Sequence, residues 1–320
     1  MAPAGAGKTQ LAVKLLEEGI AHGERVVYIN FTLNLADWIR KLPFVHKAHF
    51  IGTWHELACE AAGELPDNIP RDKLKDFYDN VSDRLLKNLN ANRYEWDLII
   101  VDDAQSLDGE WISALTNALD DIGSMYVLSD PYQTTAENNV EFSESLKITS
   151  NETARVPQRQ AEEIAALKLT SGKFISQSPY VGEYSQVYGP YNNHRSLVRE
   201  TEKAIEDAIK SGFRPEQIAI LSMNSRSRSE ILKLDQIGRH TLKKPLDTMK
   251  NGEQQFTQGE IYTDTVYRFK GLQAPYVIVT EIDFETMNQK EKAALYMAMT
   301  RCSMRLALVL SANALRTFTA

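Results

Sequence analysis

The chain has 320 residues, of which 43% are hydrophobic and 25% charged, and its formal net charge is −7. Because domains commonly have about 150 residues, this length predicts two domains, and the composition excludes collagen-like, coiled-coil and wholly disordered proteins. The sequence contains neither a membrane-length apolar run nor a basic stretch followed by an apolar one at its start, so we expect no membrane span and no signal peptide. With Cys59 and Cys302 as its two cysteines, we expect a reducing, cytoplasmic setting.

The charge is distributed unevenly between the two halves of the chain. Residues 1–150 contain 13 Lys and Arg against 24 Asp and Glu, a balance of −11. Residues 151–320 contain 23 against 19, a balance of +4. An overall negative charge argues against a nucleic-acid partner, but the mildly basic second half is compatible with one.

Helical and strand-like segments alternate along the chain. A glycine-rich start precedes apolar residues at helical spacing from Leu11 to Ile20, and an apolar run at 25–30 follows the turn at Gly23. Further buried strands are predicted at 97–101, 125–129, 217–222, 276–280 and 306–311, and helices at 108–121, 159–169, 195–211 and 289–299. This alternation predicts an α/β fold with a parallel sheet in each half.

Two segments interrupt the alternation. Residues 60–95 are polar and helical in pattern and predict a small helical insertion, whereas residues 225–260 are charged, carry turn signals and predict a linker or lobe. We place the domain boundary after the polar run 134–144. The predicted domains are therefore 1–147 and 148–320.

Gly5–Thr9 has the composition of the end of a phosphate-binding loop. Small residues let successive backbone N–H groups turn towards a β-phosphate, and Lys8 would supply a positive charge to the β- and γ-phosphates. The Thr9 hydroxyl would bind Mg²⁺, and the following helix would point its N-terminus at the anion. A departure from the full pattern is Ala2, which stands where the first glycine is expected.

Two carboxylates follow the strand predicted at 97–101. Asp102 and Asp103 would lie at the carboxyl end of that strand, where ligands bind in open α/β sheets. We expect Asp102 to hold Mg²⁺, directly or through water, and Asp103 to orient and deprotonate an attacking water.

Eight segments, in order, resemble the motifs of superfamily 1 helicases of the UvrD/Rep type. In the first half they are 4–9, 30–36, 53–55, 101–105 (VDDAQ) and 129–133 (SDPYQ). In the second half they are 154–157 (ARVP), 265–273 (TVYRFKGLQ) and 295–301 (LYMAMTR). The resemblance implies two RecA-like P-loop domains that hydrolyse ATP with Mg²⁺ between them.

The resemblance also assigns roles to individual residues. Gln133 would sense the γ-phosphate, Arg155 would reach it, and Arg301 would act as an arginine finger. The physical requirement is independent of the family, because phosphoryl transfer needs positive charge placed around the γ-phosphate. The predicted nucleotide-binding residues are Gly5, Ala6, Gly7, Lys8, Thr9, Gln10, Gly271 and Gln273.

The predicted partner is single-stranded DNA, with RNA as the alternative. Single-strand binding combines backbone or hydroxyl donors with aromatic stacking platforms. The candidates are Phe31, Thr32, Thr53, Trp54, His55, Thr265, Tyr267 and Lys270. Each aromatic, Phe269 included, could equally belong to the core, and Thr53 and Thr265 are the preferred contacts.

The sequence departs from the family pattern at several points. The family's Asp-Glu pair is Asp102-Asp103, which shortens the predicted general base, and Tyr267 and Gln273 stand where the family has His and Glu. A strand normally precedes a P-loop, so a further N-terminal segment or a protein partner is expected to supply it.

Three functions follow from these patterns. The first is an ATP-dependent single-stranded nucleic-acid translocase or helicase. The alternative is an ATP-gated nucleic-acid-binding module with weak or lost hydrolysis, because the predicted base is short. A small-molecule P-loop kinase is disfavoured, since it leaves 265–273 and 295–301 unexplained.

Overall fold

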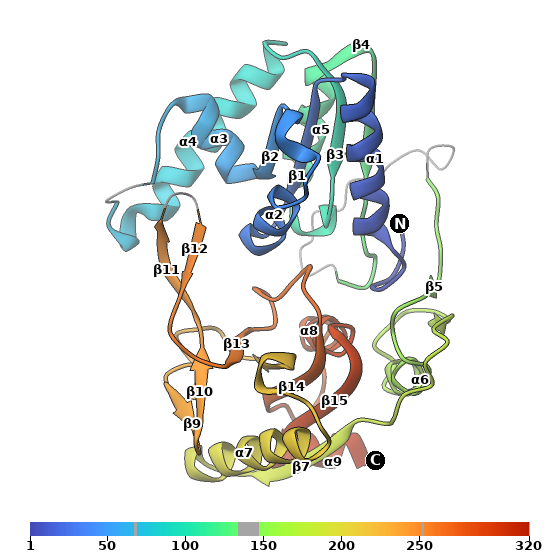
Figure 1. Ribbon diagram of the computed structural model, residues 1–320, viewed down its shortest axis with the longest axis vertical. Coiled ribbons are helices and arrows are strands. Elements are labelled where there is room, and N and C mark those ends of the chain that lie inside the picture. Colours follow the sequence, from blue (N-terminus) through green and yellow to red (C-terminus); the bar gives the residue numbers. More distant parts are fainter. Residues whose placement is uncertain (67–68, 134–146, 251–252, 320) are drawn as a thin grey trace. The chain divides into compact units, whose positions relative to one another are not determined.

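The computed structural model describes residues 1–66, 69–133, 147–250 and 253–319, which form two compact units (Figure 1). Unit 1 comprises Met1–Ala2 and Gly7–Thr149, and unit 2 comprises Pro3–Ala6 and Ser150–Ala320. The polar run 134–144 lies outside the described residues. Within the described part of the chain, no helix has both the length and the apolar character needed to cross a membrane.

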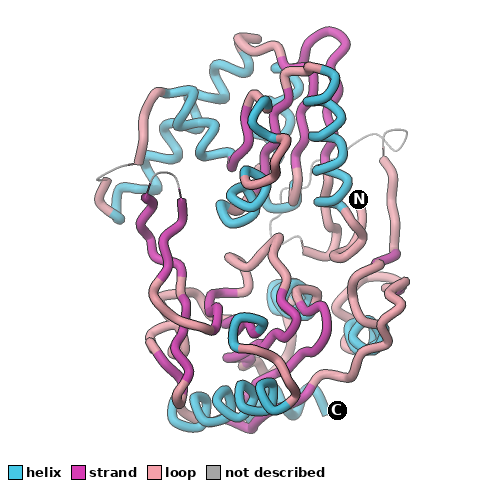
Figure 2. Tube along the Cα trace, in the orientation of Figure 1, coloured by secondary structure: helices cyan, strands magenta, loops and turns pink. Residues whose placement is uncertain are grey.

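The predicted α/β class with parallel sheets is confirmed, and Figure 2 shows strands flanked by helices in each unit. Unit 1 contains one sheet in the order β2-β1-β3-β4, in which every neighbouring pair is parallel. Its strands are β1 Val26–Asn30, β2 Phe50–Thr53, β3 Trp96–Val101 and β4 Leu119–Val127. Its longer helices are α1 Lys8–His22, α2 Leu33–Arg40, α3 Trp54–Ala62, α4 Leu74–Asn90 and α5 Gly109–Leu115. Short 3-10 turns lie at Val45–Lys47, Arg71–Lys73, Ala104–Ser106 and Thr116–Ala118.

Both faces of the unit 1 sheet are covered. On one face Tyr28 and Ile100 pack with Leu16 of α1 and with α2, and on the other Val27 and Ile99 pack with residues of α3, α4 and α5 such as Leu85. All five residues of β1 are buried as a result, which explains its continuous apolar sequence. The predicted helical insertion corresponds to the end of α3 and to α4.

The outer strand of unit 1 begins earlier than predicted. The helix expected over 108–121 is wrong beyond residue 118, because β4 already pairs with β3 from Leu119. The pairing is irregular between Trp96 and Leu98, and Ile122 is 93% exposed. Beside the end of β4, Ala2 N donates to Ser129 O at 3.0 Å.

Unit 2 contains a seven-stranded sheet in the order β7-β15-β14-β8-β13-β10-β9, parallel except for the β9–β10 pair. The strands are β7 Gln186–Tyr191, β8 Ile218–Ser222, β9 Gln236–Ile237, β10 His240–Lys243, β13 Ile261–Thr265, β14 Ala274–Ile282 and β15 Cys302–Ser311. A two-stranded sheet pairs β5 Glu152–Thr153 with β6 Ile175–Ser176. The helices are α6 Gln158–Ala166, α7 His194–Lys210, the 3-10 turn Pro215–Gln217, α8 Gln289–Met299 and α9 Ala312–Thr319.

The segment 225–260 is more regular than the linker or lobe predicted for it. It contains β9 and β10, which extend the main sheet, and a hairpin of β11 Pro245–Lys250 with β12 Glu253–Phe256 (Figure 1). Its strands are short, so they carry too few residues for a clear period-2 pattern. Leu242 of β10 nevertheless packs into the core of unit 2.

Candidate functional site

The glycine-rich loop has a backbone that its glycines permit. Gly5 and Gly7 have φ angles of 76° and 92°, a region that L-residues with side chains rarely adopt. Helix α1 begins at Lys8, immediately after Gly7, and its first regular bond is from Leu11 N to Gly7 O at 2.9 Å. The first N–H groups of α1 therefore lie at a helix N-terminus of the type that binds phosphate.

Lys8 and Thr9 point from the start of α1 to two acidic residues of unit 1. Lys8 Nζ donates to Ala2 O at 2.8 Å and lies 3.6 Å from Asp130 Oδ2. The Thr9 side chain hydrogen-bonds to Asp102. The start of α1 and the residues that follow β3 and β4 thus form one cluster within unit 1.

Asp102 is fully buried directly after β3. Its Oδ2 accepts from the Tyr28 hydroxyl at 3.1 Å, and its Oδ1 accepts from Asp103 N at 3.0 Å. Burial and the neighbouring Asp103 raise the pKa of Asp102 to about 6, against the opposing effects of Thr9, Lys8 and Tyr28. The protein neighbours of Asp102 therefore offset the charge of its ionised carboxylate only in part.

Asp103 has a left-handed backbone, with φ of 54°, at the turn that follows β3. Gln105 fixes this turn to the next one. Its Nε2 donates to Asp103 Oδ1 at 3.3 Å, and its Oε1 accepts from Asp130 N at 2.9 Å. The turns after β3 and β4 are consequently linked through one side-chain amide.

Gln133 is buried beside Asp130. Its Nε2 donates to Asp130 Oδ2 at 2.8 Å, while Tyr132 N donates to Asp130 Oδ1 at 2.9 Å. Within the described residues, Gln133 Oε1 has no hydrogen-bond partner. A buried acceptor of this kind is costly unless a water or ligand donates to it.

Three residues of this cluster were not singled out from the sequence. Gln105 and Asp130 lie inside motifs recognised as 101–105 and 129–133, and Tyr28 precedes the end of β1 by two residues. Their position near strand ends was a usable signal. Their partners are set by tertiary structure, so their contacts could not be predicted.

The donor set suits magnesium. Asp102 and Thr9 offer oxygen ligands that hydrogen-bond to each other, and the charge of buried Asp102 is undercompensated. The described part of the chain contains no group of three or more His, Cys, Asp or Glu residues that could hold a metal. Mg²⁺ commonly uses one or two carboxylates plus substrate phosphates and waters, so these residues fit it.

In unit 2 the predicted contact residue Thr265 lies at the carboxyl end of β13. Its N donates to Asp264 Oδ1 at 2.8 Å, and its Oγ1 accepts from Arg268 N at 3.2 Å. Arg268 Nε also donates to Asp264 Oδ2 at 3.1 Å. Burial raises the pKa of Asp264, and Arg268 opposes that shift.

The remaining residues of 265–273 differ in exposure. Lys270 is buried, Tyr267 and Gly271 are partly buried, and Gln273 is exposed. Burial raises the pKa of Tyr267, whose hydroxyl has no hydrogen-bond partner in the described residues. Gly271 has a φ of 77°, which explains the glycine at this turn.

The two predicted γ-phosphate arginines occupy different environments. Arg301 follows α8, is 8% exposed, and donates from Nε to Met297 O at 3.2 Å. Arg155 is exposed. Both belong to unit 2, and their approach to a nucleotide stays a prediction.

The predicted nucleic-acid contacts after β1 differ in accessibility. Phe31 is 44% exposed, and its contact with a base stays a prediction. Thr32 is buried at the start of α2, and its N donates to Asn30 Oδ1 at 2.8 Å. Gln10 is exposed on α1.

The contacts predicted after β2 are mainly structural. Thr53 caps α3: its Oγ1 accepts from Glu56 N at 3.3 Å, and its own N donates to Glu56 Oε2 at 2.8 Å. Trp54 is 1% exposed and stacks on Trp111 with ring centroids 4.7 Å apart. The expectation that Trp54 stacks on a base is therefore corrected, because its ring lies in the core.

His55 is partly buried between aromatic rings. Its ring centroid is 4.7 Å from Tyr78 and 5.5 Å from Trp111. Burial lowers the pKa of His55, which favours its neutral form. We therefore expect His55 to contact a hydroxyl or amide group of its partner, and not to bind a phosphate as a cation.

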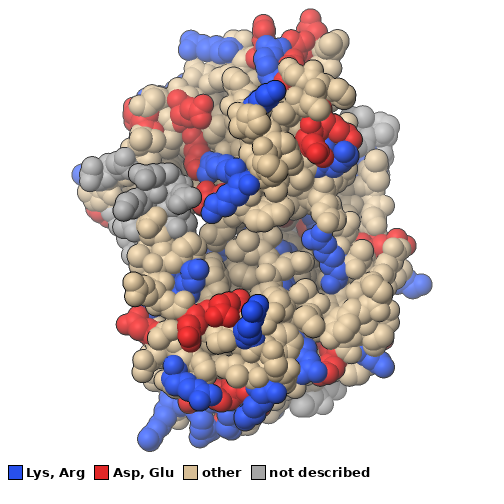
Figure 3. All heavy atoms as spheres, viewed as in Figure 1, with Lys and Arg blue, Asp and Glu red and all other residues tan. Residues whose placement is uncertain are grey.

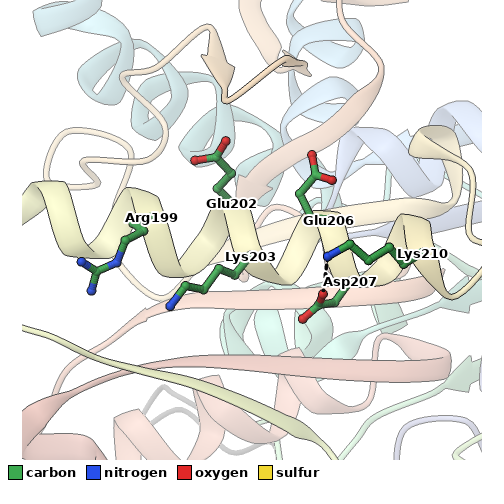
Figure 4. A pocket seen from close by; sticks show the side chains of 6 residues that line it. All are labelled: Arg199, Glu202, Lys203, Glu206, Asp207 and Lys210. Atoms are coloured by element: carbon green, nitrogen blue, oxygen red, sulfur yellow. Dashed lines mark hydrogen bonds and ion pairs between the residues drawn. The ribbon is translucent and has the colours of Figure 1, made fainter.

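A groove along α7 is unrelated to this cluster. Figure 4 shows Glu202 and Glu206 pointing to one side of the helix, Arg199, Lys203 and Asp207 pointing to the other, and Lys210 extending towards Asp207. The lining residues are Arg199, Glu202, Lys203, Glu206, Asp207 and Lys210. Figure 3 shows basic side chains gathered at the end of unit 2 where Figure 1 places α7, with acidic ones among them. Such a mixed surface provides little net attraction for a polyanion.

Residues 260–309 match the family model of the UvrD-like helicase C-terminal domain. Over these residues, the predicted resemblance to UvrD-like helicases is confirmed. The matched, helicase-like segment contains β13, β14, α8 and most of β15.

A solved structure described as the structure of PRRSV helicase is also similar, at 12% sequence identity and a TM-score of 0.46. The alignment covers 97% of this chain and 51% of that one, so this chain spans about half of the helicase chain that it matches. No curated protein matches the chain.

Proposed function

We propose that the protein is an ATP-dependent translocase or helicase that moves along single-stranded nucleic acid, with DNA as its track. The observation that carries this proposal is the cluster at the carboxyl edge of the unit 1 sheet. There Lys8 and Thr9, at the start of a helix after a glycine-rich loop, lie with Asp102 and Asp130. The match of residues 260–309 to a helicase domain supports the nucleic-acid part.

The cluster supports a different role for each of its residues around a bound nucleotide. Lys8 would bind the β- and γ-phosphates, and Asp103 would take a proton from water as its oxygen attacks the γ-phosphorus. The bond from that phosphorus to the bridging oxygen of ADP then breaks, giving ADP and phosphate. Gln133 Oε1, a buried acceptor, is suited to orient this water.

Asp102 and Thr9 are the residues proposed to hold Mg²⁺. When bound, this ion would neutralise charge that develops on the phosphate oxygens. The resemblance implies that Arg155 and Arg301 also neutralise the charge on the phosphate oxygens, and we include this role in the proposal. Phe31, Thr53, Thr265 and Lys270 are proposed contacts to the nucleic-acid strand.

The decisive experiment measures ATP hydrolysis by the purified chain with and without single-stranded DNA at low salt, where phosphate contacts are strongest. We expect stimulation by DNA. A parallel series with single-stranded RNA of the same sequence determines the preferred track. Hydrolysis that neither nucleic acid stimulates would overturn the translocase proposal.

One observation favours a second candidate function, an ATP-gated nucleic-acid-binding module. The base position holds the shorter Asp103, and Gln105 Nε2 donates to its carboxylate at 3.3 Å. A displacement of about 1 Å can reduce catalysis on the order of 100-fold. Tight ATP-dependent DNA binding with negligible turnover would favour this candidate, and brisk turnover would exclude it.

A further inference from the structure

The Asp130 carboxylate connects the phosphate-binding lysine to the γ-phosphate glutamine. A single oxygen, Oδ2, lies 3.6 Å from Lys8 Nζ and accepts from Gln133 Nε2 at 2.8 Å. The other oxygen accepts from Tyr132 N at 2.9 Å. Asp130 is fully buried, so water screens these contacts weakly.

The Lys8–Asp130 ion pair and a bound nucleotide would compete for one ammonium group. Lys8 is the residue expected to bind the β- and γ-phosphates, and a turn towards them would weaken its ion pair with Asp130. The same carboxylate would also repel the phosphates. Both effects make nucleotide binding weaker while Asp130 carries its charge.

Movement of Lys8 away from Asp130 would also change the hydrogen bond that Gln133 donates to Asp130. With Lys8 in place, Oδ2 is shared between a cation and an amide. With Lys8 on the phosphates, that oxygen loses the competing cation, which strengthens the bond from Gln133 Nε2 that orients the Gln133 amide. Nucleotide occupancy at the loop would in this way position Gln133 for water.

We infer that Asp130 is a positioning residue that holds Lys8 in a resting position and couples its transfer to the nucleotide with the orientation of Gln133. This inference rests on the proposed nucleotide-binding function. It makes a specific demand on Asp130: removal of its charge should strengthen nucleotide binding and slow hydrolysis. A merely structural role would weaken both.

The test compares the full chain with Asp130→Asn by calorimetric titration of ADP and of the ATP analogue with an imido β–γ bridge, together with steady-state hydrolysis of ATP. We expect Asp130→Asn to lower the Kd of both nucleotides roughly three- to tenfold, the range of a partly buried ion pair. Its kcat should fall at least tenfold. Asp130→Glu, which keeps the charge, should return the Kd towards the wild-type value.

Asp121→Asn is the matched control, because Asp121 is an exposed aspartate of β4. It should leave both Kd and kcat unchanged. An Asp130→Asn protein that folds but binds nucleotide with unchanged or weaker affinity would overturn the inference. If the wild type itself binds no nucleotide, the proposed function fails and this inference fails with it.

A measurement on the wild type needs no folded Asp130 variant. The side-chain amide resonance of Gln133, assigned by its loss in Gln133→Ala, should shift when the imido analogue is added, because the acceptor oxygen loses the Lys8 charge. An unshifted resonance in the nucleotide-saturated protein would contradict the coupling. A resonance that shifts with the imido analogue and with ADP alike supports it, since both carry the β-phosphate.

Discussion

The carboxyl ends of the parallel strands contain buried carboxylates in both units, but their partners differ. In unit 2, Asp264 pairs with Arg268, and Glu281 accepts from the hydroxyls of Ser222 and Ser229 and from Glu230 N. In unit 1, the carboxylates belong to a cluster whose polar groups are less completely satisfied.

Asp102 illustrates the difference. Its neighbours leave its pKa at about 6, and Gln133 Oε1 has no partner among the described residues. Groups that bind a ligand must retain unsatisfied charge or hydrogen-bonding capacity, whereas structural groups satisfy one another. This contrast supports the proposal that nucleotide chemistry takes place at the unit 1 cluster.

The largest expected effect comes from Lys8→Ala. Without its ammonium group the phosphate loop loses its positive charge, so ATP turnover should fall to background, a loss of more than about 1,000-fold. Phosphate release measures this loss. Lys14→Ala, on the exposed face of the same helix, should retain wild-type turnover; an active Lys8→Ala would contradict the role of Lys8.

Arg301→Ala tests whether unit 2 also contributes to chemistry. If Arg301 stabilises the transition state, turnover should fall about 1,000-fold while ATP affinity changes less than about tenfold. Stopped-flow turnover and calorimetric binding separate these quantities. Arg305→Ala is a control, because Arg305 is paired with Glu183 nearby in unit 2. Equal loss of affinity and turnover for Arg301→Ala would indicate ground-state binding instead.

The next effect is a pH-dependent stability change in Asp102→Asn. In the wild type, the pKa of Asp102 is raised from 3.8 to about 6, so the folded state gains stability from protonation below about pH 3.8 and loses it as the pH rises through 6. The variant should therefore match the wild type at pH 3.5 and be up to about 3 kcal/mol more stable above pH 7.

Chemical denaturation in the presence of a chelator measures this difference. Added Mg²⁺ should stabilise the wild type and leave Asp102→Asn unchanged. A stability difference that does not vary with pH would show that the protein neighbours of Asp102 fully compensate its charge.

The sequence predicted the strands that carry the site more accurately than their surroundings. Residues 26–30 and 97–101 are continuous apolar runs because both sheet faces are covered, and such runs can be recognised from the sequence alone. The start of β4 was missed because Asp120, Asp121 and Gly123 disfavour a strand, and only pairing with β3 makes it one.

For the candidate site, the phosphate-loop pattern and the strand end predicted roles for Lys8 and Asp102, and the family resemblance predicted one for Gln133. The contacts of Asp130 and the burial of Trp54 depend on residues distant in sequence, such as Trp111. Neither could be read from a local pattern.

Asp264→Asn examines the unit 2 side of the comparison. The change leaves Arg268 without its carboxylate, but it also removes a buried charge whose pKa is raised, so the two effects oppose each other and we expect a change of at most about 2 kcal/mol in unfolding free energy at pH 7. Urea unfolding measures it. A smaller effect for Asp264→Asn than for Asp102→Asn would sharpen the distinction between the units, and an Asp264→Asn protein stabilised as much as Asp102→Asn would break it.

The smallest effect is expected for Thr53→Ala, which distinguishes a structural from a binding role inside unit 1. Thr53 caps α3 through a reciprocal pair of bonds with Glu56, so its loss should cost about 1 kcal/mol of stability. Thr32→Ala is the comparison, because Thr32 begins α2 without a side-chain cap bond and should cost less.

The same variant also tests DNA binding. If Thr53 contacts a phosphate, Thr53→Ala should weaken single-stranded DNA binding, and the difference from the wild type should become smaller at high salt, because ionic strength screens the phosphate contact. A binding loss that is equal at all salt concentrations would instead follow from displacement of α3. Thr53 would then have a structural role only.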